Sequence, residues 1–410
     1  MALTVSNNVE RFKLNPSGPA IGIDLGTTNS RVGYFINNNV EIITTASGEK
    51  TVPSYVFYNG KEECMVGEPA VAQWKVYPKR VAYDSKRLIG LNYNDNVVNR
   101  NKSFWTFTVT KSDNNRPIYD IDKNHQVLPE EVSSEILKEL IKMAQDKIGT
   151  EKIESAVITV PDHFLVRQKE ATLHAAKLAG IEHVKLITES TAAAFAYGFD
   201  HKRFHGYNLF VFDLGGGTCD VSIVKVKKGE FKVIGHAGDT QLGGRGYDYR
   251  LMQYFVQKHK DLRVFESTDE IITKRKMRLR EACEALKIAL SHPSKASETI
   301  HLDEVATGLP KKNLTCKQFK EIVADLTRRC RKLCFDALEE TQLTSDNIHE
   351  VLLVGGSSKM RVIKDMLKGI FPTKELSEAI NPDEVLAYGT TLRAVIGSRK
   401  IKGLWTCRRT

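Results

Sequence analysis

The sequence predicts an α/β fold made of two similar halves, and three observations support this prediction. Apolar, strand-like runs alternate with helical patterns along most of the chain. A pattern of strand, glycine turn, strand, polar turn and strand occurs near residue 20 and again near residue 208. The length of 410 residues exceeds what one simple core needs and fits two lobes of about 150 to 200 residues each.

The repeated pattern predicts a meander of three strands in each half. Runs of β-favouring residues end at short polar turns, which lie at 37–39 in the first half and at 227–230 in the second. The expected strands are 20–24, 31–36, 40–44, 208–212, 219–226 and 231–237.

Helical periodicity and short apolar runs predict the remaining elements. Strands at 155–159 and 351–354 precede some of the helices as βα units. The polar segment 92–124 is expected to form a surface hairpin region, and 291–297 a turn-rich break. The expected helices are 129–148, 167–179, 191–197, 247–259, 268–290, 315–340 and 362–371.

The composition argues against several classes of protein. With 41% hydrophobic and 27% charged residues, the chain is typical neither of a disordered protein nor of a membrane protein. No apolar run approaches the roughly 18 residues of a spanning helix, and the start of the chain lacks the apolar segment of a secretory signal. We therefore expect a location in the cytoplasm or the nucleus.

The net charge of +10 is spread along the chain and does not by itself indicate nucleic-acid binding. One basic stripe, 274–280, falls in a helical pattern, and we interpret it as a solvated helix face rather than an RNA-binding surface. The seven cysteines are odd in number and scattered, which predicts reduced thiols. Cys330 and Cys334 lie one helical turn apart, but the four ligands of a structural metal site are lacking nearby.

Two glycine turns, each at the end of an apolar strand, are the strongest functional signal. The first runs from Asp24 through Gly26, Thr27 and Thr28, and the second runs from Asp213 through 215–218. Glycine lets backbone N–H groups approach an anion, and a carboxylate after an apolar strand is costly without a cation or partner. A third turn, Gly355 with Gly356, would let a ring or a phosphate lie against backbone. Together the turns predict a Mg-nucleotide site between two lobes.

Seven phrases of the sequence resemble the nucleotide-binding domain of the heat shock protein 70 family, in the family's order, over about residues 20 to 397. They are GIDLGTTN at 22–29, KRLIG at 86–90, ESTAAA at 189–194, FDLGGGT at 212–218, GDTQLGG at 238–244, GGS at 355–357 and NPDE at 381–384. The resemblance implies an actin-like ATPase fold, with ribonuclease H-like duplicated lobes around a central ATP cleft. It also implies slow ATP hydrolysis, with ATP or ADP, Mg²⁺ and K⁺ as cofactors.

The resemblance assigns roles to the matching residues. Asp24, Asp213 and Asp220 would hold Mg²⁺, and Asp220 would also support the K⁺ site. Catalysis would rest on Lys86 near the γ-phosphate, on Glu189 and Asp213, which orient the attacking water, and on Thr218. Contacts to the nucleotide would come from Gly26, Thr27, Thr28, Asn29, Gly215, Gly216, Gly217, Thr218, Gly243, Gly244, Glu284, Lys287, Ser291, Gly355, Gly356, Ser357, Lys359 and Asp383.

Several positions depart from the family's pattern. The family usually places an arginine on each face of the adenine, where this chain has Ile288 and Lys359, so we expect ATP binding to be weaker by about 1 to 2 kcal/mol. Ser190 replaces a proline, and Lys185 and Lys169 each replace an arginine. Because these surroundings relay the nucleotide state and receive J-domain co-chaperones in the family, we expect the changes to bear on coupling between domains.

The resemblance also predicts the domains and the partners. We expect an N-terminal extension, two actin-like lobes of which the second includes a helical subdomain near 245–320, and a basic tail, with the family's peptide-binding domain absent. A J-domain co-chaperone and a nucleotide exchange factor are the expected partners of a monomer that engages protein clients only indirectly and binds neither nucleic acid nor membrane. The boundaries are 1–19 for the extension, 20–205 and 206–397 for the lobes, and 398–410 for the tail.

The leading hypothesis is a chaperone-type ATP hydrolase whose lobes open and close as a nucleotide switch for protein-folding partners. One alternative is a nucleotide-binding scaffold or co-chaperone that does not hydrolyse ATP, and another is a truncated form of a full-length heat shock protein 70 chaperone. A sugar or acetate kinase and a filament-forming actin relative share the phosphate turns. Against the kinase, the motifs around Lys86 and Glu189 are typical of attack by water, and no acceptor-sugar motif is found.

Overall fold

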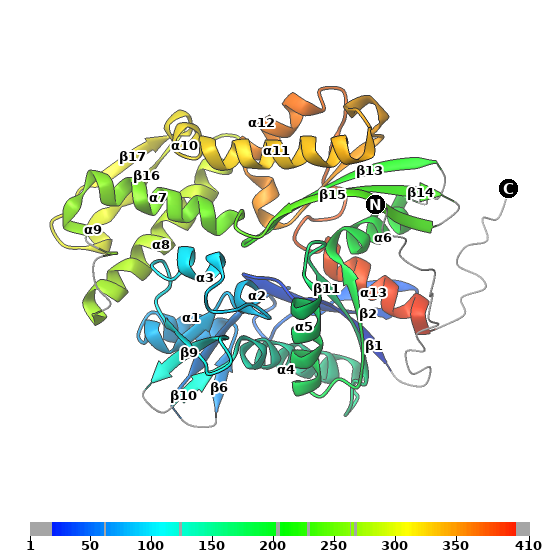
Figure 1. Cartoon of the computed structure of the whole chain (residues 1–410), viewed down its shortest axis with the longest axis horizontal. Helices are drawn as coiled ribbons and strands as arrows, with labels where there is room; N and C mark the ends of the chain where they lie inside the picture. The colour runs from blue at the N-terminus through cyan, green and yellow to red at the C-terminus, as the bar shows by residue number, and fades with distance from the viewer. Residues whose placement is uncertain are drawn as a thin grey trace.

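A computed structural model of the chain describes residues 19–60, 63–122, 125–201, 206–227, 230–262, 264–265 and 269–398 (Figure 1). The expected N-terminal extension and basic tail lie outside these residues, except for residues 19 and 398. Two large β-sheets organise the described part, one above the other in Figure 1, with helices between them and outside them. Among the described residues, no helix combines the length and the apolar composition that crossing a membrane would require.

The two large sheets share one topology. In each, three consecutive strands form an antiparallel meander, and the first of them pairs in parallel with a later strand that is itself followed by a parallel fifth strand. This repetition confirms the predicted duplication and the α/β fold class. The first sheet consists of β3 (Asn39–Ile42), β2 (Asn29–Ile36), β1 (Ala20–Asp24), β11 (Ser155–Val160) and β12 (His183–Thr188), with β4 (Val52–Pro53) paired to β2. The second sheet consists of β15 (Glu230–Asp239), β14 (Cys219–Lys227), β13 (Tyr207–Leu214), β18 (Glu350–Val354) and β19 (Leu376–Ser377).

Two helices in equivalent positions of the two halves lie between the sheets (Figure 1). α6 (Glu189–His201) follows β12 and contacts β13, β14 and β15, whereas α13 (Val385–Ser398) contacts β1, β2, β3 and β11. Apolar residues of both helices and both sheets form one shared cluster. Because α13 comes from the second half of the chain but packs on the first sheet, the lobe boundary at 205/206 stays a prediction.

The packing of α13 depends on missing side chains. A Cβ at Gly389 would lie 1.8 Å from the carbonyl oxygen of Ala192 in α6. A Cβ at Gly22 in β1 would lie 2.1 Å from the backbone nitrogen of Thr391. Real Cβ atoms do not approach other heavy atoms so closely, so backbone touches backbone at both places. Glycine at these positions is what lets α13 lie on the sheet and on α6 at once.

Other helices cover the outer faces of the sheets and extend each half. On the first sheet, α4 (Pro129–Ile148) contacts β2 and α5 (Val166–Leu178) contacts β12. On the second, α11 (Ala324–Thr341) contacts β14 and β15, and α12 (Arg361–Ile370) contacts β19. The first half also holds α1 (Glu68–Trp74), α2 (Ser85–Leu88), α3 (Asn96–Asn101) and the small sheets β6 (Cys64–Val66), β5 (Tyr55–Tyr58), β7 (Val81–Tyr83) and β10 (His125–Val127), β9 (Pro117–Asp122), β8 (Thr108–Lys111). The second half adds α7 (Gly244–Lys258), α8 (Glu270–Ser291), α9 (Leu302–Val305), α10 (Cys316–Ile322) and the hairpin of β16 (Ser297–His301) with β17 (Lys311–Thr315).

The helix expected at 315–340 is wrong as a single element, because two helices occupy that range. α10 begins after Thr315, whose hydroxyl accepts a hydrogen bond from the backbone N–H of Gln318 at 3.2 Å. Val323, at φ −102° and ψ 11°, then leaves the helical geometry before α11 begins at Ala324. Amphipathic periodicity continues across such a break, so the sequence pattern alone does not reveal it.

The basic stripe 274–280 is not a solvated helix face, contrary to the interpretation of the sequence. It lies in α8, where Lys276 and Arg280 are 4% and 3% exposed. Met277 belongs to the apolar core of the first half and Leu279 to that of the second. A helix between two cores buries more than one face, and the Arg280 guanidinium accordingly lies over aromatic rings, 4.7 Å from the centre of Trp74.

Lys276 is the residue of this stripe that burial should make most costly. Its Nζ donates to the carbonyl oxygen of Ser103 at 2.8 Å, and burial lowers its pKa from 10.5 to about 8. The unfolded chain therefore binds this proton more tightly, so the cost is complete below pH 8 and vanishes above pH 10.5. We expect Lys276→Met to raise the free energy of unfolding at pH 7 by about 2 kcal/mol, the cost of the shift less a lost hydrogen bond.

Urea unfolding at pH 7 and pH 10.5 checks this expectation. The gain should be present at pH 7 and absent at pH 10.5, where the unaltered lysine is neutral in the folded chain and about half neutral in the unfolded chain. Lys274→Met is the matched control, because Lys274 lies on the same helix and pairs with Glu270 at the surface. An equal gain from both variants would show that added apolar surface, and not relief of burial, is responsible.

Candidate functional site

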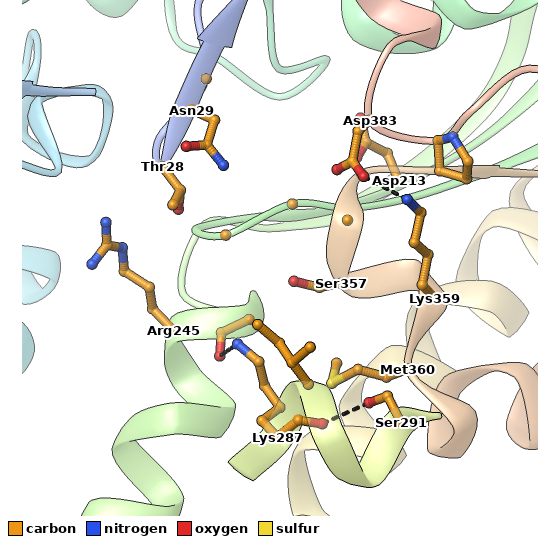
Figure 2. Close-up of a pocket in the computed structure, with 18 of the residues that line it drawn as sticks. Thr28, Asn29, Asp213, Arg245, Lys287, Ser291, Ser357, Lys359, Met360 and Asp383 are labelled. Atoms are coloured by element: carbon orange, nitrogen blue, oxygen red, sulfur yellow. Dashed lines mark hydrogen bonds and ion pairs between the residues drawn. The ribbon is translucent and has the colours of Figure 1, made fainter. Parts of the chain in front are cut away.

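A large cavity lies where strand ends of the two sheets meet. Its volume is about 1050 Å³, and it is lined by the turns that follow β1, β13 and β18 and by the C-terminal part of α8. Figure 2 shows Thr28 and Asn29 at one side, Lys359 and Asp383 at the opposite side, and Ser291 on α8 below them. In open α/β sheets, ligands bind at the carboxyl ends of strands, so the placement is typical of a ligand site.

The three glycine turns predicted from the sequence come together in this cavity. A Cβ at Gly216 would lie 2.0 Å from Thr28 Oγ1, so the second turn presses against the first. Gly355 has φ +75°, and a Cβ there would lie 2.9 Å from Asp213 Oδ1, so the third turn presses against the second. Glycine at these positions lets the three turns meet at the cavity, where their backbone N–H groups can approach a phosphate.

The structure brings most of the predicted site residues to the cavity wall. The three exceptions are Gly217, Gly243 and Asp220, which lie behind the wall. A Cβ at Gly243 would lie 2.6 Å from the backbone carbon of Gly217, so these two glycines pack against each other there. The predicted residues that line the cavity are Asp24, Gly26, Thr27, Thr28, Asn29, Lys86, Glu189, Asp213, Gly215, Gly216, Thr218, Gly244, Glu284, Lys287, Ser291, Gly355, Gly356, Ser357, Lys359 and Asp383.

Lys86 and Glu189 form a buried ion pair at one end of the cavity. Lys86 Nζ donates to Glu189 Oε1 at 2.5 Å, and the side chains are 9% and 5% exposed. Burial opposes the charge on Lys86, but Glu189 and then Asp24 raise its pKa above the usual value. Burial raises the pKa of Glu189 to about 7. The pair therefore places a fixed ammonium and a basic carboxylate at the same point of the cavity.

Two buried carboxylate oxygens mark where a cation would bind. Asp213 Oδ2 and Asp220 Oδ2 are fully buried and have no hydrogen-bond partner among the described residues. Burial, followed by the charges of Glu189 and Asp220, raises the pKa of Asp213 well above its usual value. A bound cation would give these oxygens a partner and would offset the burial and the mutual repulsion of the charged carboxylates, and oxygen ligands of this kind suit Mg²⁺.

No group of three or more histidine, cysteine, aspartate or glutamate side chains in the described part of the chain is arranged to hold a metal ion by itself. Magnesium does not require one, because it usually keeps several waters and binds through one or two carboxylates together with substrate phosphates. The carboxylates at this end of the cavity therefore fit Mg²⁺ that arrives with a phosphate ligand.

Two contacts behind Glu189 were not foreseen from the sequence. His163 Nδ1 lies 2.5 Å from Asp220 Oδ1, and Asp220 then Glu189 raise the pKa of His163 against the opposing effect of burial. Asp162 accepts from the Ser190 hydroxyl at 2.7 Å and from its backbone N–H at 3.3 Å. The bond at 3.3 Å uses a backbone N–H that a proline at position 190 would lack. Ser190, which replaces the family's proline, is therefore held by Asp162.

The opposite end of the cavity is formed by α8 and the turn after β18. Lys287 Nζ lies 2.8 Å from Asp248 Oδ1, and Ser291 donates to the carbonyl oxygen of Lys287 at 2.8 Å (Figure 2). Lys359 Nζ lies 2.5 Å from Asp383 Oδ2 (Figure 2), so its charge is engaged. Ile288 lines the cavity and is 62% exposed. The two positions at which the resemblance predicted arginines, Ile288 and Lys359, therefore both line the cavity, and the weaker ATP binding expected from them stays a prediction.

Basic residues that the sequence analysis did not single out also line the cavity. Arg245 is 3% exposed, and its Nε lies 2.8 Å from Asp84 Oδ1, which closes the wall near Thr28 (Figure 2). Arg31 lines the cavity from β2 and is 7% exposed. A charged residue inside an apolar strand was the available signal for Arg31, because such a residue is rarely buried without a partner.

Comparison with known proteins gives a consistent result. A model of the Hsp70 protein family matches residues 20–405. Heat shock cognate 70 kDa protein 3 of Dictyostelium discoideum is 37% identical over 385 residues, which are 92% of this chain and 60% of that protein. The Heat shock 70 kDa proteins of Emericella nidulans and Trichophyton rubrum are also 37% identical, over 382 residues that are 92% of this chain and 58% and 57% of theirs. The chain thus spans about 60% of the length of these curated relatives.

Proposed function

Because the chain belongs to the Hsp70 family, with an actin-like ATPase fold, we propose that it is a chaperone-type ATPase unit. It binds Mg-ATP in the cavity between the two sheets and hydrolyses the γ-phosphate slowly. Opening and closing of the two halves then acts as a nucleotide switch for protein-folding partners. The observation that carries the proposal is the buried Lys86–Glu189 pair beside the unpartnered oxygens of Asp213 and Asp220.

Each part of this arrangement has a task in phosphoryl transfer to water. Backbone N–H groups of the glycine turns and the hydroxyls of Thr27, Thr28 and Thr218 bind the β- and γ-phosphates. Lys86 stabilises charge on the transferred group, and Glu189 with Asp213 orients the attacking water and receives its proton. Asp24, Asp213 and Asp220 would hold Mg²⁺, which neutralises phosphate charge when bound.

The base and ribose would lie at the other end of the cavity. Glu284, Lys287 and Ser291 on α8 face Gly356, Ser357 and Asp383 across this end. The same proposal includes K⁺ beside Asp220, and a J-domain co-chaperone and a nucleotide exchange factor as partners. It also includes indirect action on protein clients, a monomeric state and a cytoplasmic or nuclear location. These parts of the proposal rest only on membership of the family, because the chain spans only part of the length of its relatives.

Single-turnover hydrolysis of γ-labelled ATP by the purified chain, with Mg²⁺ and K⁺, tests the proposal. Release of labelled phosphate, together with ATP binding by calorimetry, is the expected result. Binding without release would favour the non-hydrolysing scaffold, and transfer of the label to a sugar or acetate would favour a kinase. Absence of nucleotide binding would overturn the proposal altogether.

A substitution at the base end should tighten ATP binding. Ile288 is exposed at the cavity wall, and an arginine there could stack its guanidinium on the adenine. We expect Ile288→Arg to lower the Kd for ATP about two- to fivefold, as one exposed cation–π contact allows. Ile271→Arg is the matched control, because Ile271 is 67% exposed on the same helix but does not line the cavity. An equal gain from both variants in calorimetry would indicate a general effect of added charge instead.

A further inference from the structure

Arg31 is a buried cation directly beside the first phosphate turn. It lies on β2, opposite Asp24 of β1 in the antiparallel register, so its position is set by the sheet. It lines the cavity and is 7% exposed. Asp24 ends β1, and the turn from Gly26 to Thr28 follows at once. The guanidinium is therefore held at the phosphate end of the site by backbone pairing and not by a mobile loop.

The partners of Arg31 satisfy it poorly. Its Nη1 lies 3.7 Å from Asp24 Oδ2, and its Nη2 lies 3.8 Å from Asp383 Oδ1. Both distances exceed hydrogen-bond length. Its Nε is fully buried and has no hydrogen-bond partner among the described residues. A buried guanidinium held only by long ion pairs has donors left for a further anion.

Three other cations of the cavity wall are engaged more closely. Lys86 and Lys359 lie 2.5 Å from Glu189 and Asp383, and Lys287 lies 2.8 Å from Asp248. An incoming polyphosphate competes with these short pairs, whereas it competes at Arg31 only with contacts of 3.7 Å or more. Arg245, the remaining deeply buried cation of the wall, lies 2.8 Å from Asp84. Among the deeply buried cations of the wall, Arg31 is thus the one whose charge a ligand gains at the lowest cost in broken pairs.

We propose that Arg31 binds the phosphates of the nucleotide and serves as a built-in cation that holds them even without Mg²⁺. The inference rests on the proposed nucleotide site and adds a residue to it. A planar guanidinium offers paired N–H donors that match phosphate oxygens, and its charge does not leave with the metal. Arg31 also neutralises Asp24 when Mg²⁺ is absent, which removes the repulsion that this carboxylate would exert on a metal-free phosphate.

A merely structural role for Arg31 makes a different prediction. If the residue only neutralised Asp24 and Asp383, its loss would disturb the cavity for every ligand, including adenosine. If it binds phosphate, the loss of affinity should grow with the number of phosphates on the ligand and be absent for adenosine. The two roles therefore separate in a ligand series measured on one variant.

The experiment is calorimetry of ATP, ADP, AMP and adenosine with the unaltered chain, Arg31→Gln and Arg31→Lys, in Mg²⁺ and again in EDTA. We expect Arg31→Gln to weaken ATP and ADP binding about 10- to 100-fold, as loss of a charged hydrogen-bond donor allows, and to leave adenosine unchanged. The effect should be larger in EDTA than in Mg²⁺. Arg31→Lys should recover part of the affinity, because it keeps the charge but not the paired donors.

Arg116→Gln is the matched control for damage to the fold. Arg116 pairs with the buried Glu130 but does not line the cavity. Thermal unfolding of all variants accompanies the titrations, and Arg31→Lys tests the inference if Arg31→Gln does not fold. Equal losses for adenosine and ADP, or no loss for ADP, would overturn it. If the unaltered chain bound none of the four ligands, the proposed function itself would fail, and this inference with it.

Discussion

Replacement of Lys86 with alanine is expected to slow single-turnover hydrolysis of ATP about 10²- to 10³-fold, the usual effect of removing one preorganised electrostatic group. Lys86 is the ammonium of the buried pair with Glu189, and no other lysine or arginine in the described part of the chain forms an ion pair with Glu189. Its removal leaves the Glu189 carboxylate buried without its partner, so the pKa of that carboxylate should rise further above 7. Both the stabilising charge and the basic carboxylate would be weakened together.

The nucleotide affinity of this variant should change much less than the rate. Several backbone and hydroxyl groups of the glycine turns remain, and these bind substrate and transition state alike. Quenched-flow measurement of labelled phosphate, with calorimetry of ATP, separates the two quantities. Lys152→Ala is the control, because Lys152 pairs with Glu182 at the surface away from the cavity. A rate within threefold of the unaltered chain would remove Lys86 from the catalytic group.

Gly389→Ala is expected to lower the free energy of unfolding by about 3 kcal/mol, although alanine is normally the better helix residue. The added Cβ would lie 1.8 Å from the Ala192 carbonyl oxygen, which is backbone of α6 and has no rotamer to change. Relief would require α13 to move away from α6 and from β1, where Gly22 and Thr391 are already in backbone contact. The strain therefore spreads into the cluster shared by both sheets.

Gly369→Ala is a control matched in chemistry and in secondary structure. Gly369 lies in α12 and is exposed, and the nearest atom to an added Cβ is Arg331 Nη1 at 4.0 Å. This substitution should stabilise the chain by about 0.5 to 1 kcal/mol, the intrinsic preference of a helix for alanine. Urea unfolding of the two variants should thus give shifts of opposite sign. Two small shifts of the same sign would show that α6 and α13 separate without cost.

Local patterns predicted most strands of the two large sheets, because these runs have their own turn signals, but they did not predict β4, β12 or β19. The repeated meander follows from polar turns between apolar runs, and it appears as β1 to β3 and again as β13 to β15. α13 was not predicted. It is buried on several sides, carries two glycines and several β-branched residues, and therefore lacks the one-sided periodicity by which a helix is recognised.

The parts of the candidate site that are contiguous in the sequence could be predicted from it, and the parts that depend on contacts between distant segments could not. The glycine turns are contiguous in sequence, so Asp24 and Asp213 could be proposed from the residues alone. Pairs between distant segments were accessible only through the family resemblance, as for Lys86 with Glu189, which are 103 residues apart. Neither route revealed the contact of His163 with Asp220, because it depends on how β14 and the segment after β11 meet in space.

The crossing of α6 and α13 between the sheets is a point about which the two halves of the molecule could rotate. The two helices touch through backbone at Gly389 and Ala192, so this point would stay in contact if one half turned relative to the other while the apolar cluster around it repacked. A turn about a single point displaces atoms in proportion to their distance from it. A small rotation about the helix crossing would therefore displace α8, which lies well away from the crossing in Figure 1 and lines the cavity, more than the crossing itself. Such a rotation would link a change at the phosphate end of the cavity to the width of the opening through which the nucleotide leaves.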